Sequence, residues 1–135
     1  MPRLTLQLIC DDVRIENNGK LIIIGLYVDV IVVSGFPASV VLTFLQFYQV
    51  EELSRFVVNL RLSGPRGDIS EPVLMNFEPT SPGAVIGLAK IPMHVESPGE
   101  YRITLTDSDG RILHNPDGTP YKSFAILQAA TGIAR

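Results

Sequence analysis

The chain has 135 residues, the size of a single domain, and 46% of them are hydrophobic, which is too apolar a composition for a disordered protein. Only 19% are charged, and the formal net charge is −3 without a basic cluster, so the composition argues against a nucleic-acid partner. We therefore expect one domain over residues 1–135 that buries many strand faces or covers part of its surface with a protein partner.

The first predicted strand covers residues 4–10, where Leu4, Leu6, Leu8 and Cys10 recur at every second position. A spacing of two places these four side chains on one face of a strand. The run is short for the apolar region of a signal peptide and is interrupted by polar residues. We therefore read no signal peptide here and expect a cytoplasmic protein.

Cys10 is the only cysteine, so no internal disulfide can form. A catalytic thiol would need a nearby cation and a base, but the next two residues are Asp11 and Asp12, which raise a thiol pKa. Adjacent carboxylates in a strand also point to opposite faces and cannot share a metal ion unless a bulge intervenes. The pattern favours a buried, structural role for Cys10.

The charged residues Asp12, Arg14 and Glu16 follow at a spacing of two, with Val13 and Ile15 between them. Two interpretations fit this pattern. The three side chains form a solvent-facing ladder of little energetic weight, or they form a polar recognition strip on an edge strand.

A hairpin turn is predicted at Asn17-Asn18-Gly19, because Asn-Gly is the strongest short hairpin signal. The following segment, residues 21–36, is the most apolar part of the chain. Asp29 interrupts it, and it is shorter than the roughly 20 residues that a membrane-spanning helix needs. We interpret it as buried strands and expect no membrane partner.

The segment Val40–Tyr48 is apolar at successive positions, as in a strand buried on both faces. Together with the preceding strand it supplies more apolar residues than one-sided strands can hide, so a patch is left for a protein partner or a second copy unless the core is larger. The candidate interface residues on the second face of these strands are Ile22, Ile24, Val41, Leu45 and Phe47.

Further strands are predicted from period-two patterns and from the Gly- and Pro-rich turns that separate them. They cover Phe56–Ser63, a segment from Val73, Tyr101–Thr106, Arg111–His114 and Tyr121–Leu127. Only residues 49–54 and 128–135 offer short helical candidates. The spacing predicts an all-β fold, an antiparallel immunoglobulin-like β-sandwich of about eight or nine strands.

A local motif, Ser97-Pro98-Gly99-Glu100-Tyr101, precedes one of these strands. It has the form of the tyrosine corner of immunoglobulin-like sandwiches, in which a tyrosine hydroxyl bonds to an upstream backbone group. Alternatively, Pro98-Gly99 is an ordinary turn and Tyr101 an ordinary core residue.

Several stretches together resemble a family of small uncharacterised bacterial β-sandwich proteins. They are the C-D-D-V-R-x-E-x-x-G-K opening from Cys10 to Lys20, Gly25–Tyr27, Phe36-Pro37, Gly64–Gly67 and Pro98–Arg102. The resemblance covers most of the chain and is most specific at the opening. It implies a compact sandwich-like domain and no assigned catalytic activity.

Candidate catalytic and metal-binding groups are few. His94 and His114 are the only histidines, and neither a zinc-binding nor a catalytic spacing is present, so we predict neither an enzyme nor a cofactor. Asp107, Asp109 and Asp117 are weak candidates for a calcium site, since Asp-Gly sequences are also what tight turns require.

Two functional hypotheses result. The first is a non-enzymatic binding or assembly module that acts through exposed strand faces and loop ends, with a homo-oligomer as one form of the assembly. The alternative is a small-ligand or calcium-binding sandwich with a site among the end loops at Asp107–Pro120 and Arg66–Asp68. The tripeptide Arg66-Gly67-Asp68 matches an adhesion motif, but a turn explains it equally well.

Overall fold

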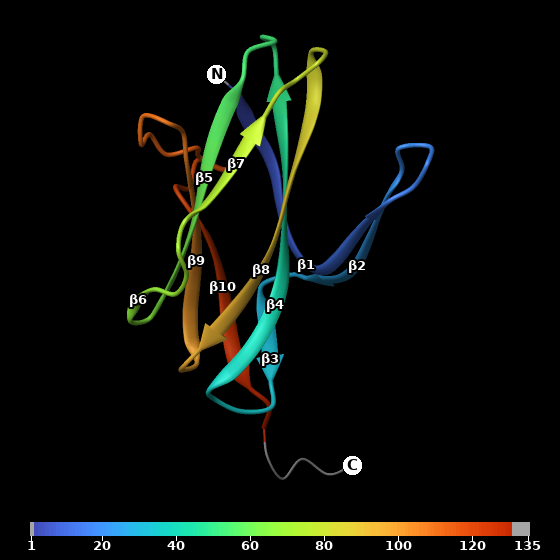
Figure 1. Cartoon of the computed structure of the whole chain (residues 1–135). Coiled ribbons are helices and arrows are strands. Elements are labelled where there is room, and N and C mark those ends of the chain that lie inside the picture. The colour runs from blue at the N-terminus through green and yellow to red at the C-terminus, as the bar shows by residue number, and fades with distance from the viewer. Residues whose placement is uncertain (1, 131–135) are drawn as a thin grey trace.

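The computed structural model describes residues 2–130, which form two β-sheets packed face to face (Figure 1). Within these residues there are ten strands and no helix, which confirms the all-β sandwich predicted from the sequence. No helix in this part of the chain therefore has the length and apolar character that crossing a membrane would require.

The first sheet has four strands in the order β2-β1-β4-β8 and the second has six. The strands of the first sheet are β1 (Arg3–Ile15), β2 (Leu21–Tyr27), β4 (Ala38–Val50) and β8 (Gly83–Val95). The second sheet has the order β3-β10-β9-β5-β6, and β7 also pairs with β5. Its strands are β3 (Val30–Val33), β5 (Phe56–Gly64), β6 (Gly67–Asp68), β7 (Val73–Phe77), β9 (Gly99–Thr106) and β10 (Lys122–Gln128).

The apolar segment after the first turn divides between the two sheets. β2 ends at Tyr27 in the first sheet, and after two residues the chain enters the second sheet as β3, which runs parallel to β10. The backbone carbonyl of Asp29 accepts a hydrogen bond from the Ala125 amide (2.8 Å) and fixes this crossing. The predicted sandwich is therefore antiparallel except for this one pair among the described strands.

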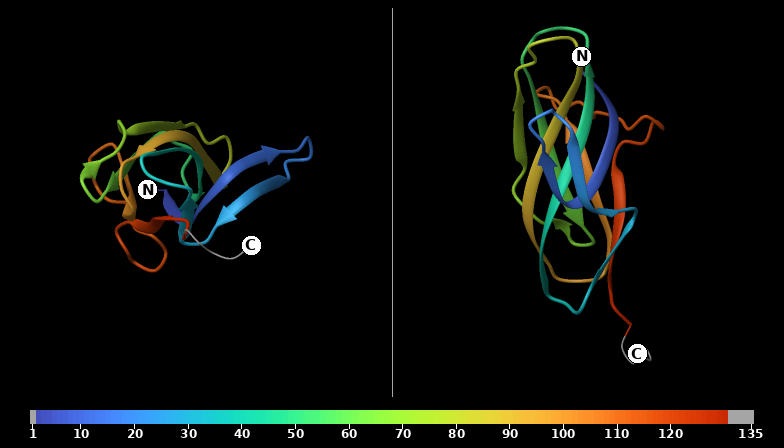
Figure 2. Two further views of the ribbon diagram at one scale, coloured as in Figure 1. Left: turned by 90° about the horizontal axis from the view of Figure 1, so that it is seen from below. Right: turned by 90° about the vertical axis from the view of Figure 1, so that its right-hand side faces the viewer.

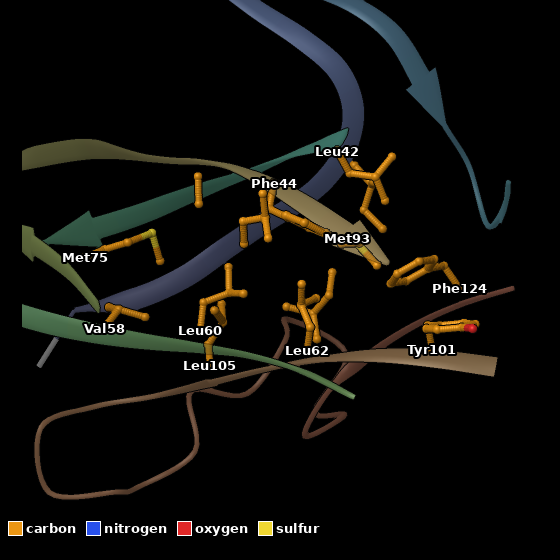
Figure 3. Packing of buried hydrophobic residues seen from close by; sticks show 14 of the residues in the cluster. Leu42, Phe44, Val58, Leu60, Leu62, Met75, Met93, Tyr101, Leu105 and Phe124 are labelled. Atoms are coloured by element: carbon orange, nitrogen blue, oxygen red, sulfur yellow. The ribbon is translucent and has the colours of Figure 1, made fainter. Parts of the chain in front are cut away.

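The core lies between the sheets and is built mainly from alternate residues of the longer strands (Figure 3). Leu42 and Phe44 of β4 face Leu60 and Leu62 of β5, and all four are almost completely buried. The Phe44 ring also packs against Phe124 of β10 at a centroid distance of 6.5 Å. Burying a side chain of this kind stabilises the fold by about 1.5–3 kcal/mol.

The tyrosine corner is present. The Tyr101 hydroxyl donates a hydrogen bond to the backbone carbonyl of Ser97 over 2.5 Å, and burial raises the pKa of this hydroxyl. Because the acceptor is a carbonyl group, the contact does not depend on which side chain occupies position 97. The Tyr101 ring also lies close to Gly64, where a Cβ atom would come within 2.8 Å of it.

The prediction that Leu4 shares a face with Leu6, Leu8 and Cys10 was wrong for Leu4. The register of β1 against β4 shifts between Leu4 and Leu6, so that Leu4 lies opposite Tyr48 and faces the core. A bulge of this kind inserts one extra residue and reverses the alternation on one side of it. Sequence alternation does not reveal it, because the residues on both sides are apolar.

The predictions for three short segments also differ from the structure. The segment predicted as a strand at Arg111–His114 forms only an isolated bridge between Thr106 and Ile112. Residues 49–54 contain the end of β4 and no helix. Of the helical candidate at 128–135, Gln128 ends β10 and residues 131–135 lie outside the described part of the chain.

Candidate functional site

The face of the four-stranded sheet that points away from the core is apolar. Strand alternation places it opposite the core residues Leu42 and Phe44 of β4. Two rows of side chains in cross-strand register run over β1, β4 and β8 on this face. We call it the outer apolar face, and its residues are Leu6, Leu8, Leu45, Phe47, Ile86 and Leu88.

One of the residues predicted to form an interface on this face is not exposed. Leu45 lies on the predicted face but is fully buried (0% exposed) because its cross-strand neighbours enclose it, so it cannot itself contact a partner. Phe47 is half-buried, whereas Val41, Ile22 and Ile24 are exposed. The second face of these strands is thus apolar, with its exposed residues around a buried centre.

Cys10 lies at the margin of the same face and is buried. Its sulfur contacts the backbone carbonyl of Thr43 at 3.7 Å. Burial raises the pKa of the thiol, and the carboxylates of Asp11 and Asp12 raise it further. The thiol is therefore protonated and enclosed, as the structural interpretation of Cys10 predicted, and it is not placed to act as a nucleophile.

Beyond Cys10, β1 leaves β4 and continues with β2 as its only strand partner. The resulting two-stranded ribbon, residues 12–24 with its turn, is called the arm. It stands away from the body of the molecule, on the side of the four-stranded sheet opposite the six-stranded sheet (Figures 1 and 2). A lone two-stranded hairpin is at best marginally stable in water, so its exposed position calls for a physical reason.

The base of the arm is held by a cluster of polar contacts. The Tyr27 hydroxyl donates a hydrogen bond to Oδ1 of Asp11 (2.6 Å), and the Thr43 hydroxyl donates one to the Asp11 backbone carbonyl (3.1 Å). Gly25, opposite Asp11, has a φ of +67°, and a Cβ atom there would lie 2.1 Å from Asp11 Oδ2. The hydrogen bond to Asp11 raises the pKa of Tyr27 to about 12. Sequence reasoning missed this cluster, although all its members except Thr43 lie in the stretches that carry the family resemblance.

The two faces of the arm differ in chemistry. Val13 pairs with Ile23 and Ile15 with Leu21, which gives one face made only of apolar side chains. We call this the arm's apolar face.

The opposite, mixed face of the arm carries two charged and two apolar residues. Asp12 lies across from Ile24, and Arg14 lies across from Ile22. Of the predicted polar strip, Asp12 and Arg14 therefore share a face, while Glu16 follows the end of β1 and begins the turn. The strip is interleaved with isoleucines and is not a purely solvated ladder.

The predicted calcium-binding aspartates take part in hydrogen bonds within the turns in which they lie. Oδ1 of Asp107 accepts hydrogen bonds from the backbone amides of Asp109 and Arg111 (2.9 Å each). Oδ1 of Asp117 accepts from the hydroxyl and amide of Thr119, and these bonds lower the pKa of Asp117. Within residues 2–130, no three His, Cys, Asp or Glu side chains gather as metal ligands. The three aspartates therefore do not form the shared calcium site considered from the sequence.

The two end loops also line different hollows. Residues 115–123 and 5–7 border an open groove of about 610 Å³, in which Gln7 Nε2 donates to Asn115 Oδ1 (2.8 Å). The loop at Arg66–Asp68 borders a separate hollow of about 290 Å³ beside Tyr101. The two loops that were predicted to share one ligand site therefore border different hollows.

Comparison with known proteins places the chain in a family without assigning an activity. A search of curated proteins found no match. A family model described as "Family of unknown function (DUF6941)" matches residues 5–116, which include β1 from its third residue and all of β2 to β9, and thus the arm and the outer apolar face. Because the match covers well over half of its 135 residues, the chain belongs to this family of unknown function, DUF6941.

Proposed function

We propose that this protein is a non-enzymatic assembly module that associates with further copies of itself through the outer apolar face. The observation that carries the proposal is that Leu6, Ile86 and Leu88 are exposed around the half-buried Phe47 and the buried Leu45, which lie between them on β4. Single exposed apolar residues are ordinary, but contiguous ones mark interaction surfaces.

The chemistry of the face favours a protein surface over a small ligand or a substrate. The two rows contain no charged or hydrogen-bonding side chain that could orient a small molecule. The nearest charges are at its margin, where Lys90 lies 3.9 Å from Asp12. A second copy is the simplest partner, because most soluble oligomers are symmetric assemblies of one chain.

A bacterial origin and a cytoplasmic location remain part of the proposal. The first is supported by the resemblance of the opening stretch to small bacterial proteins. The second is supported by the single, protonated thiol of Cys10, which suits a reducing compartment.

The solution mass tests the proposal. Light scattering over a range of concentrations should give at least twice the chain mass of 14.8 kDa for the wild type. Leu88→Asp places a charge on the outer apolar face and should reduce the mass to that of one chain. Leu127→Asp is the matched control, because Leu127 is about equally exposed (43% against 45%) but lies in the other sheet. A wild type that stays at 14.8 kDa at every concentration would contradict the proposal.

A further inference from the structure

We propose that two copies exchange arms, so that the arm's apolar face of each copy covers the outer apolar face of the other in a two-fold dimer. This inference rests on the proposed self-association and names the surface that each copy offers its partner. Four observations lead to it.

The first observation is that the arm's apolar face is open to solvent, with two of its residues, Val13 and Leu21, half-buried. It carries no charge, and Ile15 and Ile23 are exposed. None of its four residues belongs to the core or packs against it. A two-stranded ribbon with an open apolar face gains stability only when another surface covers that face.

The second observation is that the chain cannot cover this face with its own outer apolar face. By strand alternation, Val13 and Ile15 lie on the opposite side of β1 from Leu6 and Leu8. The arm rises on the outer side of the sheet (Figures 1 and 2). Strand alternation then turns its apolar face away from its own body. The hydrogen bonds of Asp11 with Tyr27 and Thr43 at the base hold the arm in this direction, so the cover must come from another molecule.

The third observation is that the two surfaces match in character and size. Neither contains a charged residue. Four residues of each arm strand span roughly 13 Å, and the three strands under the outer apolar face span about 10 Å between their axes. In a two-fold dimer, the arm's apolar face of each copy contacts the outer apolar face of the other. The same chain therefore supplies both surfaces of two identical contacts.

The fourth observation concerns the mixed face of the arm. In an arm-exchanged dimer the two arms lie between the two bodies and meet through Ile22 and Ile24. The charges beside these isoleucines are Asp12 and Arg14, which have opposite sign at neighbouring positions. Two arms related by a two-fold axis can place Asp12 beside Arg14 of the second copy, so the arrangement is self-complementary.

The test is a complementation experiment with two variants. Ile15→Asp places a charge on the arm's apolar face at a position that is 66% exposed, and Leu88→Asp disables the outer apolar face. Each variant alone should have the mass of one chain. An equimolar mixture should contain a heterodimer, because the intact arm of Leu88→Asp can lie on the intact face of Ile15→Asp. Energy transfer between differently labelled chains measures the formation of the heterodimer. Its affinity should be weaker than that of the wild-type dimer, because only one of the two contacts is intact.

The controls exclude misfolding and non-specific association. Each variant must keep the wild-type far-ultraviolet circular dichroism spectrum and a cooperative urea transition. The double variant with both aspartates has neither surface, and it should not associate with Ile15→Asp. Leu127→Asp should behave as the wild type in every mixture.

The outcomes separate this inference from the proposed function. If Ile15→Asp remains oligomeric while Leu88→Asp is monomeric, the outer apolar face mediates association without the arm, and arm exchange is overturned. If both variants are monomeric and the mixture does not associate, the intact arm of one variant does not bind the intact face of the other, and arm exchange is again overturned. A monomeric wild type removes both proposals.

Discussion

The hydroxyl of Tyr27 donates a 2.6 Å hydrogen bond to Oδ1 of Asp11, at the point where β1 separates from β4 and the arm begins. The bond joins β2 to β1 beside Gly25, whose lack of a Cβ atom leaves room for the Asp11 carboxylate. These contacts fix the direction of the arm, and substitutions at this point test whether the base of the arm is as rigid as its geometry indicates.

Replacing Gly25 by alanine should destabilise the protein more than the same change at Gly19. Both glycines have a positive φ (+67° and +82°), which costs a residue with a Cβ atom about 1–2 kcal/mol. A Cβ atom at Gly19 meets nothing within 4 Å, whereas one at Gly25 would lie 2.1 Å from Asp11 Oδ2 and displace that carboxylate. Urea unfolding followed by circular dichroism measures both losses, and equal losses would contradict a tightly packed base.

Tyr27 should ionise only near pH 12, because its hydrogen bond to Asp11 raises its pKa from the usual 10 to about 12. Since the folded state holds this proton more tightly than the unfolded state, the bond adds stability in full below pH 10. That contribution is lost as the pH rises from 10 to 12. The difference in tyrosinate absorbance between wild type and Tyr27→Phe isolates this group. A difference titration centred near pH 10 would show that the bond does not persist in solution.

The strands themselves are largely predictable from the sequence, because alternation and turn residues act locally. The prediction Phe56–Ser63 differs from β5 by one residue, and the Asn17-Asn18-Gly19 turn joins β1 to β2 as expected. The sequence did not, however, predict that the apolar segment at residues 21–36 divides between two sheets. This division depends on the pairing of β3 with β10, which is about 95 residues further along the chain, and no local pattern encodes such a partner.

The candidate site was predictable in part. The surplus of apolar residues at Ile22, Ile24 and Val41 indicated an exposed surface, and these residues are exposed. The burial of Leu45 depends on its neighbours on β1 and β8, which the sequence does not place beside it. The arm depends on β1 leaving β4 after Cys10, although β1 itself continues as one strand to Ile15.

Two buried tyrosines should respond differently to loss of the hydroxyl. The Tyr101 hydroxyl bonds to the Ser97 carbonyl, so Tyr101→Phe should lower the free energy of unfolding by about 1 kcal/mol. The Tyr48 hydroxyl is buried without a hydrogen-bond partner among the described residues, so Tyr48→Phe should be neutral or stabilising. Urea midpoints at a fixed pH near neutrality compare them. A larger loss from Tyr48→Phe than from Tyr101→Phe would contradict this assignment.

Two glutamines that lie opposite each other on β1 and β4 provide the last test, because the same substitution should act on them with opposite sign. Gln46 is fully buried (0% exposed), and neither Nε2 nor Oε1 of its amide has a partner within the described chain. It lies between Gln7 and Gly87 in the sheet register, and a Cβ atom at Gly87 would come within 2.6 Å of Oε1. Gln7, in contrast, donates a hydrogen bond to Asn115.

Methionine has nearly the shape of glutamine without its polar atoms. Gln46→Met should therefore raise the free energy of unfolding by about 1–3 kcal/mol, because it removes a buried amide that has no partner. Gln7→Met should lower it by about 1 kcal/mol, because Asn115 loses its donor. Chemical unfolding of the two variants beside the wild type gives both signs directly. Destabilisation by both substitutions would show that the Gln46 amide makes a favourable contact in the core, and the unsatisfied assignment would then be wrong.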